Sequence, residues 1–212
     1  MRIVVFGADT GLGREIVTEL VHGGHTVTAV LPAHAPVPGQ WRGRVVLHPG
    51  NALEAGALDD VIAGTEVVID ALGDCRGRRA LSQAAAAATA ITDSMVRLGC
   101  YRYIGLRPDV LLAPAGKRLS WGGALRLWQL RCGLRTREET AQAFTAVARS
   151  PLSWTILRCP GLIDGPARGI RHVAMTHRHR VGSSLTRADA ARFLTTQLRH
   201  SRYVCAAPAI SN

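Results

Sequence analysis

The stretch VVFGADTGLGREIV, residues 4–17, places Gly7, Gly11 and Gly13 between an apolar run and a segment of helical periodicity. The residues before Gly7 are mostly β-branched or aromatic, as in a buried strand. From residue 12 onward, apolar residues recur at helical spacing until a GG pair that favours a helix end. The stretch therefore predicts a strand, a tight glycine turn and a helix.

The same alternation continues along the chain. Strands are predicted at 2–6, 25–31, 44–50, 65–73, 101–106 and 153–161, and helices at 12–21, 53–64, 79–98, 137–149 and 186–198. Strands separated by helices indicate right-handed crossovers and a parallel sheet covered on both faces. The predicted fold class is α/β, a doubly wound Rossmann-type sheet forming one domain over residues 1–212. The irregular segment around 108–135 is interpreted as a lid-like loop.

Ligands of such a sheet bind beyond the carboxyl ends of the strands, at the switch point beside the first strand. There Gly7 would allow the tight turn, Gly11 the approach of backbone N–H groups to a pyrophosphate, and Gly13 close packing of helix on sheet. The spacing G-x-x-x-G-x-G differs from the usual G-x-G-x-x-G, and an ordinary strand-to-helix turn is the alternative. Its place on the first strand of an alternating chain favours a dinucleotide site.

Composition narrows the class of protein. The chain has 212 residues, 47% of them hydrophobic, and no apolar run reaches the ~18 residues of a membrane span. The N-terminus does not resemble a signal peptide. Five widely spaced cysteines without a CxxC pair argue against a disulfide framework and a zinc site. We therefore expect a cytoplasmic protein with no metal and no membrane partner.

The net charge of +11 raises the question of a nucleic-acid partner. The arginines are scattered along the chain, and Lys117 is the single lysine. The densest basic cluster, residues 168–180, is interpreted as a solvated loop in preference to a phosphate-binding surface. A small molecule is the expected partner, and nucleic acid is not.

Several segments carry a family resemblance. GADTGLG at 7–13 resembles the glycine loop of short-chain dehydrogenases. Three later segments are similar to the compact atypical branch that includes NmrA-like proteins and biliverdin-IXβ/flavin reductases: GNALEAGALDDVIAGTEVVIDALG at 50–73, RSPLSWTILRCPGLIDGP at 149–166 and SLTRADAARFLTTQL at 184–198. The resemblance covers most of the chain in the right order and is poor between 106 and 135. It implies an NAD(P)-binding Rossmann domain.

The resemblance also implies binding roles at individual positions. The loop Gly7–Gly13 would hold the pyrophosphate, with Asp9 and Thr10 as hydrogen-bonding side chains beside Leu12. Asn51 would flank the adenine. The residues implied on the ribose side are Ala71, Leu72 and Gly73, and those implied beside the nicotinamide are Cys159, Pro160, Gly161 and Leu162. Each has an alternative, since residues 71–73 could simply end a strand and Cys159 could be a small buried apolar residue.

The end of the second strand bears on the choice of coenzyme. An NAD site usually has an acidic residue there, and the sequence AVLPAHAP at 29–36 has none. The arginine that NADP-using relatives often place there is also missing, because Leu31 takes its position. His34, Arg42 or Arg44 could reach a 2′-phosphate from the following loop. We therefore expect NADP in preference to NAD.

The Tyr-x-x-x-Lys pair of the larger family is absent, because no tyrosine precedes Lys117 by four positions. The usual serine is missing as well, since the fifth strand leads into Arg107 and Pro108. A standard carbonyl reductase is therefore not expected. Arg107 is the candidate catalytic residue, which could stabilise negative charge developing on an oxygen. The alternative is a surface arginine at a strand end.

Three functions remain open. The first is an NAD(P)H-dependent oxidoreductase that passes hydride to a flavin, quinone or polyaromatic acceptor needing no protein acid. The second is a non-catalytic NADP-binding sensor. The third is a repurposed isomerase, cyclase or dehydratase, for which His172, His177 and His179 are candidate titrating groups.

The segment 119–135 bears on the substrate. Trp121 and Trp128 form an apolar stripe with several leucines beside arginines. This pattern suits a lid over a flat aromatic or anionic molecule. A homodimer contact and a plain amphipathic helix are the alternatives.

Overall fold

The structure is a computed structural model that describes residues 1–50, 57–75, 77–112, 134–176 and 181–212. Its strands are β1 (Arg2–Phe6), β2 (Thr26–Leu31), β3 (Val45–Pro49), β4 (Val67–Asp70), β5 (Arg102–Pro108), β6 (Ser153–Cys159), β7 (Gly161–Ile163), β8 (His172–Ala174), β9 (Ser184–Thr186) and β10 (Ala209–Ser211). Its α-helices are α1 (Gly11–His22), α2 (Ala57–Ile62), α3 (Arg78–Leu98), α5 (Leu134–Arg149) and α6 (Arg187–Thr196), and its 3-10 turns are η1 (Gly39–Trp41), η2 (Leu72–Asp74) and η3 (Asp109–Leu111).

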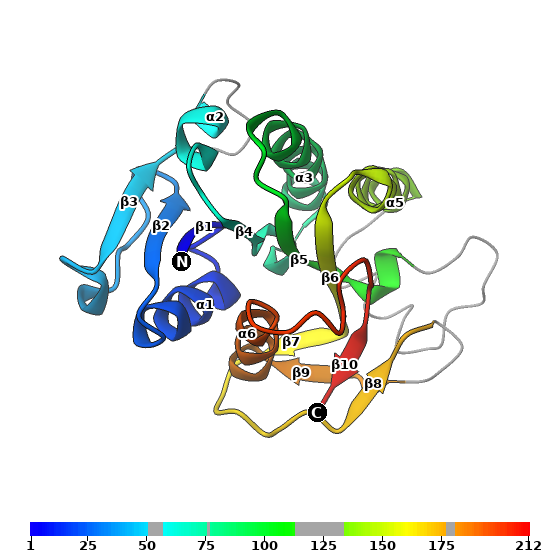
Figure 1. Cartoon of the computed structure of the whole chain (residues 1–212). Coiled ribbons are helices and arrows are strands. Elements are labelled where there is room, and N and C mark those ends of the chain that lie inside the picture. Colours follow the sequence, from blue (N-terminus) through cyan, green and yellow to red (C-terminus); the bar gives the residue numbers. More distant parts are fainter. Residues whose placement is uncertain (51–56, 76, 113–133, 177–180) are drawn as a thin grey trace.

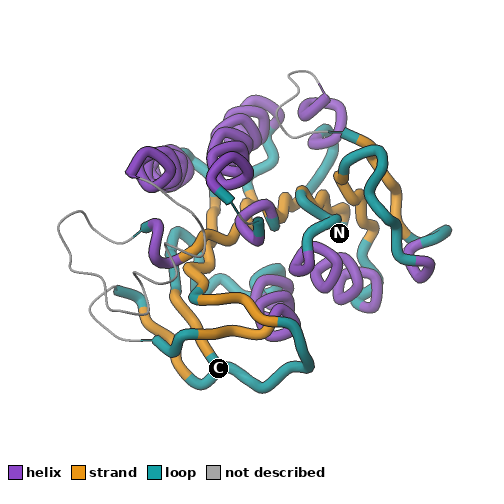
Figure 2. The backbone as a smooth tube through the Cα atoms, turned by 180° about the vertical axis from the view of Figure 1, so that it is seen from behind, coloured by secondary structure: helices purple, strands orange, loops and turns teal. Residues whose placement is uncertain are grey.

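Eight of the strands form one sheet, in the order β3-β2-β1-β4-β5-β6-β10-β8. All neighbours in it are parallel except β10 and β8, which pair antiparallel. Helices α1 and α6 cover one face of the sheet, and α2, α3 and α5 cover the other, as Figures 1 and 2 show. The predicted fold class, a doubly wound α/β domain, is confirmed.

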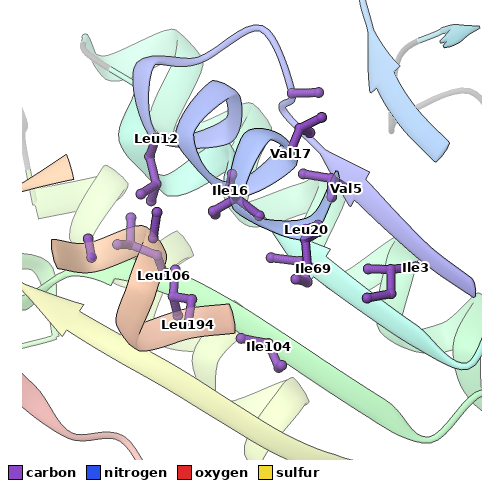
Figure 3. Close-up of a cluster of buried hydrophobic side chains, with 14 of the residues drawn as sticks. Ile3, Val5, Leu12, Ile16, Val17, Leu20, Ile69, Ile104, Leu106 and Leu194 are labelled. Atoms are coloured by element: carbon purple, nitrogen blue, oxygen red, sulfur yellow. The ribbon is translucent and has the colours of Figure 1, made fainter. Parts of the chain in front are cut away.

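The main core lies between the sheet and the pair α1 and α6. Figure 3 shows side chains from α1, from the central strands and from α6 meeting in one cluster, in which the labelled residues are Ile3, Val5, Leu12, Ile16, Val17, Leu20, Ile69, Ile104, Leu106 and Leu194. The apolar spacing of α1 faces this cluster, because positions three and four apart share one side of a helix. Burial of these side chains fixes α1, and with it the glycine loop, against the carboxyl end of β1.

The six predicted strands and five predicted helices are all present, with shifted ends. Four short strands, β7 to β10, were not predicted. Of the segment around 108–135, Pro108 ends β5, Asp109–Leu111 form η3, and residues 134–135 begin α5. The rest of the expected lid, including Trp121, Trp128 and Lys117, lies outside the described residues.

Among the residues that the structure describes, no helix is long and apolar enough to cross a bilayer. Within the same ranges, no group of three or more potential ligand side chains is placed to hold a metal ion.

Candidate functional site

The chain reverses its direction of winding at β1. From β1 it continues outward through β2 to β3, then crosses back to β4 on the other side of β1. Beyond the carboxyl ends of β1 and β4 lie the loop 7–13 and the turn 71–74. We call these two segments the switch point, which is where ligands bind in doubly wound sheets.

Two of the loop glycines are required by its backbone geometry. Gly7 has φ 73°, in the left-handed region that favours glycine. A Cβ atom at Gly13 would lie 2.1 Å from the carbonyl oxygen of Gly7. The expected tight turn at Gly7 and close helix–strand packing at Gly13 are therefore confirmed.

Thr10 caps the N-terminus of α1. Its Oγ1 accepts a hydrogen bond from the Gly13 amide at 2.9 Å and donates to the Gly7 carbonyl at 2.8 Å. Asp9 is half-buried in the same turn. The hydroxyl predicted to bind pyrophosphate thus also fixes the shape of the loop, as an N-cap does.

The turn after β4 packs directly against this loop. A Cβ at Gly7 would lie 3.1 Å from the Leu72 amide nitrogen, and a Cβ at Gly73 would lie 2.1 Å from the Leu106 carbonyl oxygen. Ala71 is fully buried. The structure therefore brings together the residues predicted on the pyrophosphate side and those predicted on the ribose side.

An ion pair that sequence reasoning missed lies over the loop. The Leu12 amide donates to Asp74 Oδ2 at 2.8 Å. Arg187, the first residue of α6, binds both oxygens of that carboxylate, with Nε at 2.7 Å and Nη2 at 2.9 Å. The hydrogen bonds that Arg187 donates to the Asp74 carboxylate raise the pKa of its guanidinium.

Arg187 also packs on the glycine loop itself. A Cβ at Gly11 would lie 2.6 Å from its Nε. Its Nη1 binds Asp164 at 2.8 Å. The sequence did point to the two positions separately, because Asp74 directly follows the predicted residues 71–73 and Arg187 lies in segment 184–198, which carries the family resemblance. Neither segment shows that the two residues form a pair.

Arg107 belongs to a buried network. Its side chain is 4% exposed, and Nη2 lies 2.7 Å from Asp70 Oδ2. The Tyr103 hydroxyl donates to the same oxygen at 2.7 Å, and the Leu72 amide donates to Oδ1 at 2.9 Å. The alternative of a surface arginine is therefore wrong, while the catalytic role stays a prediction.

Burial and neighbouring charges together set the pKa values of the groups in this network. Burial is the largest single influence and would lower the pKa of Arg107, but Asp70 and Tyr103 act together in the opposite direction and the pKa is raised. Burial, together with Asp70, raises the pKa of Tyr103 well above its usual value. Burial also raises the pKa of the nearby Cys75 thiol to about 12. The network is thus a fixed ion pair with protonated neighbours, and it holds the turn at Leu72.

The residues predicted beside the nicotinamide follow β6. Cys159 and Leu162 are buried in the core shared with α1 and α6, while Pro160 and Gly161 are half-buried. Strand β7 pairs with β9, which leads into Arg187. These residues lie on the side of the switch point toward α6, and their contact with a nicotinamide stays a prediction.

The residues considered for coenzyme choice lie apart from one another. Leu31 ends β2 and is 4% exposed, within the core. His34 follows shortly after and is exposed at the same edge of the sheet. Arg44 instead precedes β3 at the opposite edge, with Nη2 3.5 Å from the carbonyl oxygen of Val21, and this position does not favour its suggested contact with a 2′-phosphate. Asn51 lies outside the described residues.

The histidines considered for proton transfer are not gathered by the described structure. His172 begins β8, is exposed and pairs with Ser211 of β10. His177 and His179 lie outside the described residues.

A family model described as NAD(P)H-binding matches residues 7–201. A search of curated proteins found no match to the sequence.

Similar solved structures share the fold at low sequence identity. A short-chain dehydrogenase/reductase from Veillonella parvula in complex with NADP has a TM-score of 0.78 at 16% identity, covering 100% of this chain and 94% of that chain. ChuY from Escherichia coli O157:H7, described as an anaerobilin reductase, has a TM-score of 0.78 at 20% identity and coverage of 100% and 97%. A putative NAD-dependent epimerase/dehydratase from Bacillus halodurans has a TM-score of 0.81 at 19% identity and coverage of 100% and 94%.

Proposed function

Because this chain belongs to the NAD(P)H-binding family, we propose that it is an NADPH-dependent oxidoreductase of the atypical short-chain type that reduces a flavin, quinone or polyaromatic acceptor. The observation that carries the proposal is the glycine loop at the switch point. Positive φ at Gly7 and the absence of a Cβ at Gly13 bring the N-terminus of α1 against the end of β1. Amides at such a helix end suit a pyrophosphate.

The residues present fit a dinucleotide, whose nicotinamide supplies a hydride when it is bound. On this chain, the loop 7–13 would hold the phosphates and the turn 71–73 would border the ribose. The residues after β6 would orient the nicotinamide. The contribution of the protein is to bind and orient both reactants.

The tyrosines support an acceptor that needs no strong protein acid. The chain has three of them. Tyr103 is buried against Asp70, Tyr101 precedes β5 at the far edge of the sheet, and Tyr203 packs against Phe193. A flavin or quinone can take its proton from solvent, so the proposal requires no tyrosine at the switch point.

We favour NADPH over NADH because no acidic residue ends β2. The exposed His34 can approach a 2′-phosphate from the loop that follows. The NADP complex of the Veillonella protein supports a nicotinamide coenzyme on this fold. The description of ChuY adds anaerobilin to the acceptors worth testing.

The test is a fluorescence titration of the purified protein with NADPH and NADH, followed by addition of flavin mononucleotide, a naphthoquinone and anaerobilin. We expect tighter binding of NADPH and its oxidation by at least one acceptor, measured as loss of nicotinamide absorbance. Tight binding without oxidation by any acceptor would contradict the oxidoreductase and favour the NADP-binding sensor. Turnover of a substrate without net consumption of coenzyme would favour the isomerase, cyclase or dehydratase.

A further inference from the structure

We propose that Asp74 is an internal competitor of the coenzyme pyrophosphate, and that coenzyme binding transfers the Leu12 amide and the Arg187 guanidinium from the Asp74 carboxylate to a phosphate. This inference rests on the proposed function, since it concerns the same site. It assigns Arg187 as a pyrophosphate-binding residue and Asp74 as the residue that limits coenzyme affinity.

The first argument is the hydrogen bonding of the loop amides. The Leu12 amide donates to Asp74 at 2.8 Å, the Thr10 amide to the Gly7 carbonyl at 3.0 Å, and the Gly13 amide to the Thr10 hydroxyl at 2.9 Å. The last two bonds form the turn and the cap of α1. The bond from Leu12 holds an anion, so a phosphate oxygen that used this amide would have to displace Asp74.

The second argument is the position of Arg187. Its side chain is only 12% exposed, and it packs on Gly11 at the loop. Its backbone is anchored, because the preceding Thr186 caps α6 through the Asp189 amide. The guanidinium can therefore keep its place while its partner changes. Its fork of donors fits a phosphate as well as a carboxylate.

The third argument is charge. A carboxylate and a pyrophosphate within the same few ångströms repel one another in a partly buried site. Asp74 is 7% exposed, so solvent screens this repulsion weakly. The two anions therefore exclude each other. Asp164, which is 92% exposed, binds Nη1 of Arg187, whereas Asp74 binds Nε and Nη2, so the two carboxylates use different nitrogens.

The inference predicts opposite effects for the two partners. Asp74→Ala is expected to tighten binding of NADPH and of inorganic pyrophosphate by about tenfold, the factor of one charge-assisted hydrogen bond. Arg187→Gln is expected to weaken binding of both by about tenfold on the same grounds. Asp164→Asn is the matched control, since it removes the other carboxylate on Arg187 but touches no loop amide, and it should change affinity by less than about twofold.

The experiment measures the Kd of NADPH by fluorescence and that of inorganic pyrophosphate by calorimetry for the wild type and the three variants. Circular dichroism checks that each variant is folded, and Asp74→Asn replaces Asp74→Ala if the latter is not. Tighter binding of pyrophosphate by the Asp74 variant, with the Asp164 control unchanged, would support the inference even if NADPH fails to bind, in which case the proposed function alone falls. If the wild type binds NADPH and the Asp74 variant binds it no more tightly, the inference is overturned and the proposed function stays intact. Failure of the wild type and the Asp74 variant to bind either probe would overturn both.

Discussion

At the scale of single residues, the carboxylate of Asp70 organises the end of β4. It accepts hydrogen bonds from the Tyr103 hydroxyl, the Arg107 guanidinium and the Leu72 amide, all three between 2.7 and 2.9 Å. Gly105 leaves the space that this arrangement needs, because a Cβ there would lie 2.8 Å from the Tyr103 hydroxyl oxygen. A buried charge is tolerated when it is paired and hydrogen-bonded. The network therefore positions the turn that borders the glycine loop.

Breaking this pair should be costly. Arg107→Met leaves Asp70 charged and buried without its cation, and we expect a loss of about 3–5 kcal/mol in the free energy of unfolding. Adding Asp70→Asn to that variant removes the uncompensated charge and should recover part of the loss. Urea denaturation of the two variants and the wild type measures both effects.

An unchanged stability of Arg107→Met would contradict this account of the network. The same variant addresses the predicted catalytic role. A fall in kcat of the folded protein at saturating coenzyme would support that role, whereas an unchanged kcat would leave Arg107 with a positioning role.

His34 provides a test of coenzyme choice. His34→Glu places a negative charge near the expected 2′-phosphate, so NADPH should bind about tenfold more weakly, as for other like-charge contacts, while NADH changes little. Arg44→Glu makes a larger change of charge at the opposite edge of the sheet and serves as the control. Equal weakening of both coenzymes by His34→Glu, or equal effects of the two variants on NADPH, would argue against a 2′-phosphate near His34.

At the scale of elements, the joint between α1 and β2 has a pH-sensitive residue. His25 lies just before β2, and burial is the largest cause that lowers its pKa from 6.5, followed by the charge of the N-terminal amine and that of Arg199. The folded state thus favours the neutral imidazole. The unfolded chain therefore takes up a proton more readily than the folded protein as the pH falls below 6.5. Neutral His25 contributes to the stability of the fold above that pH, and this contribution is lost below it.

We therefore expect the free energy of unfolding to fall between pH ~6.5 and pH ~5 in the wild type, and to fall less in His25→Gln. Urea denaturation at the two ends of this range measures the difference. His22→Gln, at an exposed position of the same helix end, is the control. An identical pH dependence in the wild type and His25→Gln would show that His25 does not couple protonation to folding.

The elements also show what the sequence could and could not predict. Long apolar runs and helical spacing predicted the six main strands and five helices, because burial on a sheet or a helix face leaves a readable period. Strands β7 to β10 have only three residues each, too few to show a period. Strand β10 pairs with β6, β8 pairs with β10, and β7 and β9 pair with each other, so these strands form only once the fold brings their partners together.

At the scale of the whole molecule, one part of the candidate site could be predicted from the sequence and another part could not. The roles of Gly7 and Gly13 in shaping the loop were predictable, since they follow from local backbone geometry. The pairing of Asp74 with Arg187 was not, because the two residues are 113 positions apart in the chain. Likewise, the sequence places Arg107 at the end of a predicted strand. Its contact with Asp70 could not be predicted, because it depends on how β4 pairs with β5.

The placement of the coenzyme over the glycine loop is the central claim, and a crystal structure of the protein grown with saturating NADPH tests it most directly. We predict the pyrophosphate within hydrogen-bonding distance of the amides at the start of α1, beside Gly11 and Gly13, with the ribose bordered by Ala71–Gly73. NADPH bound at any other surface, with the loop amides making no contact to a phosphate, would contradict the account.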